Sequence, residues 1–138
     1  MTYFHDGDEV YRYIGGLLTS LVDSPDLGEK LKRADTTVQF RYHHPEAVIT
    51  FKLVEGEDVR VDLGDSELEP EIVMTADADV AHLFWLGRVN VTVALARGQM
   101  KATGPVAKIL KLVPLIKPVF PLYRELLERE GRTDLLEV

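Results

Sequence analysis

Cysteine is absent from this chain of 138 residues, which excludes disulfide bonds, cysteine-ligated zinc and thiol catalysis. Long apolar runs are missing too, since no stretch approaches the ~18 residues that a membrane span needs. The first six residues have neither a basic start nor an apolar run. We therefore expect no signal peptide and a cytoplasmic protein, in which the Asn-Val-Thr sequon at Asn90 carries no glycan.

Acidic residues are missing from one third of the chain, between Val80 and Arg124. That third has a net charge of +7, whereas residues 1–79 carry −11 and residues 125–138 carry −3. It is also the most apolar third, and this combination favours an anionic headgroup or a membrane surface. Bases that solvate the outer faces of core helices would give the same pattern. We expect no nucleic-acid partner, because the chain is acidic overall and lacks a basic cluster among aromatic residues.

A helix is predicted to begin after Asp6, whose carboxylate can accept from the free N–H groups of the first turn. Glu9 is placed as the reciprocal capping-box residue. Apolar residues then follow helical spacing as far as Leu21. Gly15 and Gly16 lie inside this helix, each at a cost of up to ~1 kcal/mol relative to alanine, which favours close packing of another segment at this point.

Four strands are predicted after a short second helix. Residues 36–43, 47–54 and 59–63 alternate apolar and polar side chains, and residues 71–76 are β-branched at their centre. Turn sequences separate these segments. We expect an antiparallel meander with one wet face, whose dry face is covered by the flanking helices.

Residues 77–112 carry the most informative pattern. Asp77 can cap a helix, Gly87 can end it in a left-handed conformation, and the circumference between them is almost entirely apolar. A helix that is apolar all round is buried or lines an apolar cavity. In residues 90–96, Val91, Val93 and Leu95 alternate with other residues as in a strand.

A fifth strand is predicted over residues 99–103, and Gly104-Pro105 opens a further helix. In the segment that follows, lysines interrupt a run of apolar residues. Prolines at positions 114, 118 and 121 each remove a backbone donor and clash with the preceding turn. The pattern predicts helical pieces that are hinged at these prolines.

The order of these elements resembles the sterol carrier protein 2 (nonspecific lipid-transfer) domain family over about residues 6–130. The resemblance lies in the acid-capped helix, the glycine that ends it, and Gly98-Gln-Met-Lys-Ala-Thr-Gly104 ahead of an apolar helix. It implies a helix at 90–96 and one lipid-carrier domain over residues 1–138. The implied fold class is α+β, with a single layer of about five mostly antiparallel strands covered on one face by helices.

The candidate ligand site is a set of apolar residues that can face one interior. Taken alone they would simply fill a core, but the resemblance implies a hydrophobic cavity between sheet and helices that holds a lipid. Arg88, Arg97 and His82 are candidates for contact with the ligand headgroup, although a lone histidine on an apolar helix equally suits a satisfied core position. The apolar set is Leu17, Leu21, Phe40, Phe51, Leu83, Phe84, Leu86, Met100, Ile109, Leu112, Leu115 and Ile116.

Catalytic and metal-binding motifs are not evident. No serine stands in a nucleophile elbow, and no glycine-rich phosphate loop follows a strand. His43 and His44 are adjacent, so in a strand they point to opposite faces and cannot bind one metal ion together. We expect no catalytic residue, no metal, no cofactor and no enzyme activity.

The leading interpretation is non-catalytic binding of a hydrophobic ligand such as a fatty acid, acyl chain, sterol or other lipid. The sequence does not separate transfer from storage or sensing. The segment from Pro105 to Tyr123 would act as a lid that also makes transient contact with a membrane surface. Two alternatives stay open: a small α+β-cone enzyme of isomerase or dehydratase type with an apolar substrate, and an interaction or homodimerisation module that uses the cationic, apolar C-terminal segment.

Overall fold

The computed structural model describes residues 2–138 and begins with a block of helical segments. These are α1 (Gly7–Val10), η1 (Tyr11–Gly15), α2 (Gly16–Ser20), η2 (Leu21–Asp23), α3 (Pro25–Leu31) and η3 (Lys32–Ala34). Asp6 caps the first of them as predicted, because its Oδ1 accepts from the Glu9 N–H at 3.1 Å. The Glu9 carboxylate accepts in turn from the His5 N–H at 2.5 Å, one residue earlier than the predicted donor.

Close packing at Gly15 is confirmed. A Cβ at this position would lie 2.8 Å from the Leu63 Cδ2 atom, which is closer than carbon atoms can approach. The missing side chain therefore lets the first helical block approach the end of a strand.

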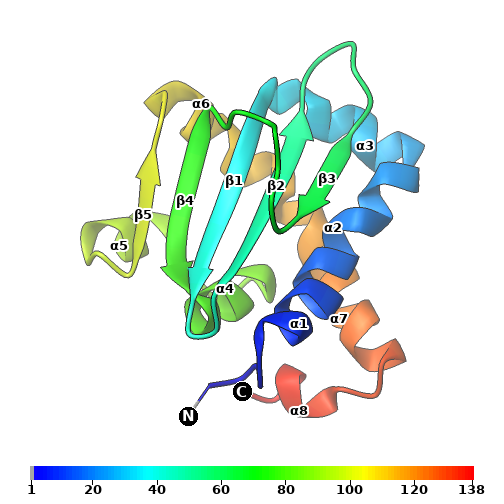
Figure 1. Ribbon diagram of the computed structural model, residues 1–138, viewed down its shortest axis with the longest axis vertical. Helices are drawn as coiled ribbons and strands as arrows, with labels where there is room; N and C mark the ends of the chain where they lie inside the picture. Colours follow the sequence, from blue (N-terminus) through cyan, green and yellow to red (C-terminus); the bar gives the residue numbers. More distant parts are fainter. Residues whose placement is uncertain (1) are drawn as a thin grey trace.

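Five strands form one mixed sheet with the spatial order β3-β2-β1-β4-β5 (Figure 1). They are β1 (Thr36–His43), β2 (Ala47–Leu53), β3 (Arg60–Leu63), β4 (Ile72–Asp77) and β5 (Met100–Thr103). Three of the neighbouring pairs are antiparallel, and β1 pairs with β4 in parallel. The predicted four-strand meander is therefore wrong at its last step. After β3 the chain returns across the sheet and the Glu71 N–H donates to the Thr37 carbonyl at 2.9 Å, which places β4 beside β1.

The remaining helices cover one face of the sheet. Two of them come between β4 and β5 along the chain, namely α4 (Ala78–Trp85) and α5 (Val91–Ala96). The helix implied at 90–96 is therefore confirmed. After β5 come α6 (Val106–Ile116), η4 (Lys117–Val119), α7 (Phe120–Arg129) and α8 (Thr133–Leu136). Figure 1 shows α6 and α7 on one side of the sheet and no helix on the opposite face, which the segment between β3 and β4 crosses. This arrangement is the α+β fold class that the sequence predicted.

Pro114 lies inside α6, so the predicted hinge at this proline is wrong. The missing N–H leaves the Leu110 carbonyl without its usual helical partner. Both residues are exposed on the outer side of the helix, where water can hydrate that carbonyl. A break at Pro118 is confirmed, because this residue lies in η4, and Pro121 lies in the first turn of α7, which begins directly after that break.

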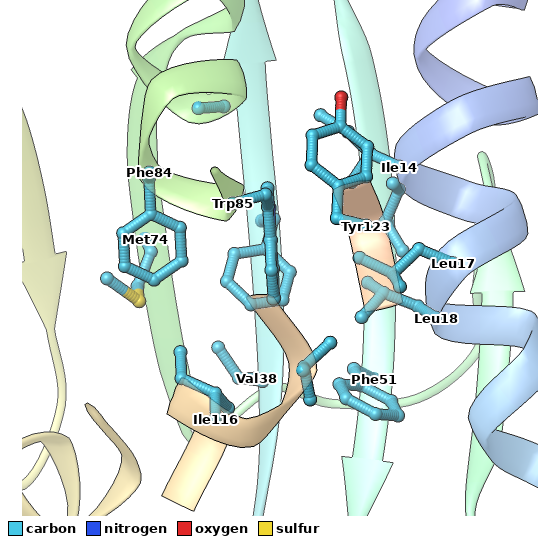
Figure 2. Close-up of a cluster of buried hydrophobic side chains, with 14 of the residues drawn as sticks. Ile14, Leu17, Leu18, Val38, Phe51, Met74, Phe84, Trp85, Ile116 and Tyr123 are labelled. Carbon is cyan, nitrogen blue, oxygen red and sulfur yellow. The ribbon is translucent and has the colours of Figure 1, made fainter. Parts of the chain in front are cut away.

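One hydrophobic core extends from Phe4 to Leu135. Figure 2 shows side chains of the first helical block, the sheet, α4, α6 and α7 meeting around Trp85. Trp85 is fully buried, and its Nε1–H donates to the Tyr42 hydroxyl at 3.1 Å. Every buried side-chain nitrogen or oxygen among residues 2–138 has a hydrogen-bond partner, so this core is polar only where hydrogen bonds compensate.

Candidate ligand-binding groove

The predicted ligand-binding residues lie together in the hydrophobic core. Ten of the twelve are buried, and Leu83 and Leu115 are partly buried against the same cluster. Several of them, including Leu17, Phe51 and Ile116, appear in Figure 2 as side chains packed against one another. The structure thus places the set in one interior. The ten buried members are Leu17, Leu21, Phe40, Phe51, Phe84, Leu86, Met100, Ile109, Leu112 and Ile116.

An apolar groove opens beside this core, at the edge of the sheet where α5, β5 and α6 meet. Its volume is about 520 Å³, and its lining residues are Leu95, Ala96, Gly98, Met100, Lys101, Ala102, Val106, Ile109 and Leu110. The local structure explains the lining. Side chains alternate along β5, so Met100 and Ala102 face the helices while Lys101 faces the other way. Val106 and Leu110 are four residues apart, which places them on one face of α6.

Val106 and Leu110 are the most exposed large apolar side chains in the described chain, at 68% and 67%. Met100 and Ile109 belong to the predicted set and are almost completely buried, and they form the boundary between the groove and the core. The groove therefore begins at the surface and ends against core side chains. Sequence reasoning missed Val106 and Leu110 as site residues because α6 carries apolar residues on both faces, so periodicity does not tell which face is covered.

A second hollow adjoins the groove at the start of β5, with polar and charged side chains along part of its lining. Its volume is about 400 Å³, and its lining includes His43, Thr75, Asp77 and Lys101. Lys101 and Gly98 line both hollows. Asp77 occupies the N-cap position of α4 as predicted, but its carboxylate makes no capping hydrogen bond and lies 3.6 Å from the Nδ1 atom of His44. Lys101 therefore stands between two hollows, of which the second also has a histidine and a carboxylate in its lining.

His82 is completely buried in α4. Its Nε2 lies 2.7 Å from the Leu135 carbonyl and its Nδ1 lies 2.8 Å from the Tyr123 hydroxyl. Because a carbonyl can only accept, Nε2 carries the proton and Nδ1 accepts from Tyr123. Burial lowers the pKa of His82, and the hydrogen bond to Leu135 partly opposes this effect. His82 thus has the surroundings of a satisfied core histidine.

The two predicted headgroup arginines differ in their surroundings. The Arg88 guanidinium donates to the carbonyls of Leu136, at 3.1 Å, and Val138. It is outside the groove lining, as is His82. Arg97 is exposed and follows Ala96, a lining residue. Within residues 2–138, neither Arg97 nor Lys101 forms an ion pair, so both cations are available at this end of the groove.

Shifted carboxylate pKa values occur in ion pairs of the fold. The pKa of Glu71 is lowered by the hydroxyl of Thr36 and by Lys108, which lies 2.9 Å away. The pKa of Asp62 is lowered by hydrogen bonds from Arg60 and Ser66. Residues 2–138 contain no group of three or more potential ligands placed for a metal ion, and no helix among them could cross a bilayer.

Solved structures share this fold. Sterol carrier protein 2 from Yarrowia lipolytica, in its apo form, superposes with a TM-score of 0.63 at 18% identity and covers 87% of this chain and 95% of its own. The sterol carrier protein domain 2 of Helicoverpa armigera gives a TM-score of 0.64 at 18% identity, with coverages of 88% and 95%. At this level of identity, the likeness concerns the fold alone.

The same fold also forms part of a larger enzyme. The inverting sec-alkylsulfatase Pisa1 from a Pseudomonas species matches with a TM-score of 0.54 at 15% identity, over 64% of this chain and 14% of the sulfatase. A comparison with curated proteins finds no significant match. The model of the SCP-2 sterol transfer family matches residues 16–117, which confirms the resemblance drawn from the Gly98–Gly104 segment. The chain therefore belongs to the SCP-2 sterol transfer family.

Proposed function

We propose that this chain is a non-catalytic carrier that binds a hydrophobic ligand in the groove between α5, β5 and α6. The ligand classes are a fatty acid, acyl chain, sterol or other lipid. The observation that carries the proposal is that Val106 and Leu110 remain about two-thirds exposed over an apolar hollow of about 520 Å³. Covering two such side chains is favourable by up to ~1.5–3 kcal/mol each. Membership of a sterol transfer family supports the same assignment.

The groove has the size and chemistry of a small-molecule site. Ligand pockets usually enclose about 300–1,000 Å³ and are mostly apolar with a few polar groups. Each CH₂ group removed from water contributes ~0.8 kcal/mol, so a ten-carbon chain gains roughly 8 kcal/mol before the cost of ordering is subtracted. Met100 at the inner wall is flexible and polarizable, which suits contact with chains of different shape.

Helix α6 provides the movable wall of the site. Its inner residues Ile109, Leu112 and Ile116 are buried in the core, so a ligand longer than the groove has to displace this helix. The segment from Pro105 to Tyr123 would then act as the lid. Its helix α6 is continuous, and the break at η4, which contains Pro118, supports movement of α6 about that point.

Arg97 and Lys101 are the proposed partners of an anionic headgroup. Both are exposed cations at one end of the groove, and Lys101 also lines the adjoining hollow. A carboxylate or phosphate held there would form charge-assisted hydrogen bonds. Arg88 and His82 serve the C-terminal segment instead, through Leu135, Leu136 and Val138.

Residues 1–138 would act as one carrier domain with its core at about residues 6–130, since a single hydrophobic cluster joins Phe4 to Leu135. We also include lipid transfer in the proposal. Transfer requires transient contact with a membrane surface, because a lipid has to be collected from one bilayer and delivered to another.

The proposal is tested with protein purified without detergent. Native mass spectrometry with organic extraction should reveal a bound lipid, and empty protein should take up a fluorescent fatty acid. Leu110→Gln should weaken that uptake by roughly tenfold, which corresponds to losing about half of the apolar contribution of one leucine. Val22→Gln is the matched control, since Val22 is also exposed, at 43%, but lies outside the groove.

Two results would contradict the carrier assignment. One is a protein that contains no lipid and takes up none. The other is uptake that falls equally in Leu110→Gln and Val22→Gln, because a ligand site elsewhere would then be required.

A further inference from the structure

One face of α6 is left uncovered by the rest of the fold. The residues on this face follow one another within a single arc at about 100° per residue, while Ile109, Leu112 and Ile116 lie buried on the opposite side. The helix therefore presents one apolar side to the core and a second, largely apolar side to solvent. The exposed members are Val106, Ala107, Leu110, Lys111, Pro114 and Lys117.

Unpaired cations surround this apolar face. Among residues 2–138, none of the exposed bases Arg97, Lys101, Lys111 and Lys117 forms an ion pair. Lys108, on the flank of the helix, is neutralised by Glu71 at 2.9 Å. The segment from Val80 to Arg124 contains no acidic residue at all, in a chain whose net charge is −7. An excess of positive charge is thus concentrated in one segment of an acidic protein.

Helix α5 extends the same edge. Val93 is 40% exposed and Arg97 follows the last residue of α5. Figure 1 shows α5 and β5 together at the edge of the sheet, on the side away from α1, α2 and α8. Three of the six exposed large apolar side chains in the described chain, Val93, Val106 and Leu110, belong to this edge.

We propose that the edge formed by α5, β5 and the outer face of α6 docks on a membrane surface that carries anionic lipids. Apolar side chains would enter the boundary between headgroups and acyl chains, while the surrounding lysines and arginines contact the lipid anions. A second copy of this chain fits less well, because it would bring the same unpaired cations face to face. The inference rests on the proposed carrier function and names the partner of the same site.

Docking in this orientation turns the groove toward the bilayer. Val106 and Leu110 line the groove and also belong to the docking face. An acyl chain would therefore pass from the lipid layer into the groove without crossing water. The acidic first half of the chain, with its charge of −11 over residues 1–79, is repelled by the same lipids, which favours this orientation over others.

The first test measures flotation of the full chain with phosphatidylcholine vesicles, with and without phosphatidylglycerol. The protein should float only with the anionic vesicles. The double variant Lys111→Gln and Lys117→Gln should lose about 25-fold in vesicle affinity, at roughly fivefold per cation near a charged surface. The matched control is Arg12→Gln with Arg129→Gln, which removes the same charge from exposed positions in η1 and α7 and should bind vesicles as the wild type does.

The second test uses the absence of cysteine. A single cysteine introduced as Leu110→Cys and labelled with an environment-sensitive dye should shift its emission to the blue when anionic vesicles are added. The same label at Val22→Cys should not respond. A label at Leu110→Cys that responds to protein concentration without vesicles would overturn the proposal in favour of a second copy, as would flotation that ignores phosphatidylglycerol or is equal in both double variants.

Fatty-acid uptake from solution separates this inference from the carrier function. Neither Lys111 nor Lys117 lines the groove, so the double variant should take up a fluorescent fatty acid as the wild type does. Uptake without vesicle docking overturns the docking surface alone. Docking without uptake refutes the carrier function and leaves the membrane surface standing.

Discussion

Acidification should destabilise this protein through one buried residue, His82. The ring is fully buried, and in the folded chain it is neutral, with Nε2–H donating to the Leu135 carbonyl and Nδ1 accepting from the Tyr123 hydroxyl. A proton added to Nδ1 would abolish that acceptor and leave a charge in the core. Burial accordingly lowers the pKa of His82 below its ordinary 6.5.

The sign and size of the effect follow from proton linkage. The unfolded chain takes up the proton near pH 6.5, before the folded chain does, so the stability from neutral His82 is fully present above pH 6.5. It declines as the pH falls toward the folded pKa, by up to ~1.4 kcal/mol per pH unit. Lowered carboxylate pKa values, as at Asp62 and Glu71, act below about pH 4.5. Between about pH 4.5 and pH 6.5, we therefore assign the loss of folding stability to His82.

Urea unfolding at a series of pH values measures this slope. The wild type should lose stability steadily from pH 6.5 down to about pH 5, and His82→Gln should be less stable at neutral pH but flatter over that interval. Tyr123→Phe should cost ~1–3 kcal/mol at pH 7.5, because it leaves Nδ1 without a donor. A wild-type profile as flat as that of His82→Gln would show that His82 does not titrate differently on unfolding, and would refute the assigned hydrogen-bond network.

Other substitutions give sharp contrasts in the same unfolding assay. Gly104→Ala should cost at least ~2 kcal/mol, because its φ is 127° and a Cβ would lie 2.5 Å from the Glu71 carbonyl oxygen. Gly56→Ala, with φ at 80° and no atom within 4 Å of the added Cβ, should cost only ~1 kcal/mol. Leu112→Ala should cost ~2–5 kcal/mol through a core cavity, whereas exposed Leu110→Ala should stay within ~0.5 kcal/mol. Equal losses within either pair would contradict the packing described.

Local signals in the sequence predicted most elements of the fold. The Asp6 cap, the alternation in β1 and the glycines around β5 depend on neighbours within a few residues, which is why the sequence reveals them. The parallel pairing of β1 with β4 could not be predicted in this way. It joins Val38 to Ile72, with β2 and β3 between them in the chain, and no local pattern distinguishes it from a further hairpin. Family resemblance resolved residues 90–96, where periodicity alone suggested a strand.

The candidate site was harder to predict than the fold. The apolar residues selected from the sequence do converge, but burial depends on which segments pack against α6, and α6 is apolar on both sides. Met100 and Ile109 were the only predicted residues that reach the groove within the described chain. The carbonyl acceptors of His82 and Arg88 lie in the last four residues of the chain. No sequence motif links positions so far apart, so these contacts could not be predicted.

The hydrogen bonds between the C-terminal segment and earlier parts of the chain have a consequence for how the protein is made. His82 obtains its carbonyl partner from a residue 53 positions later, and Arg132 bonds to Glu9 and Tyr13, 123 and 119 positions earlier. A ribosome adds roughly 5–20 residues per second, so several seconds pass between the synthesis of His82 and that of its acceptor. The native hydrogen bonds of His82 can therefore be completed only after translation has reached Leu135, and a chain that stops short of this residue leaves the Nε2–H group without its acceptor.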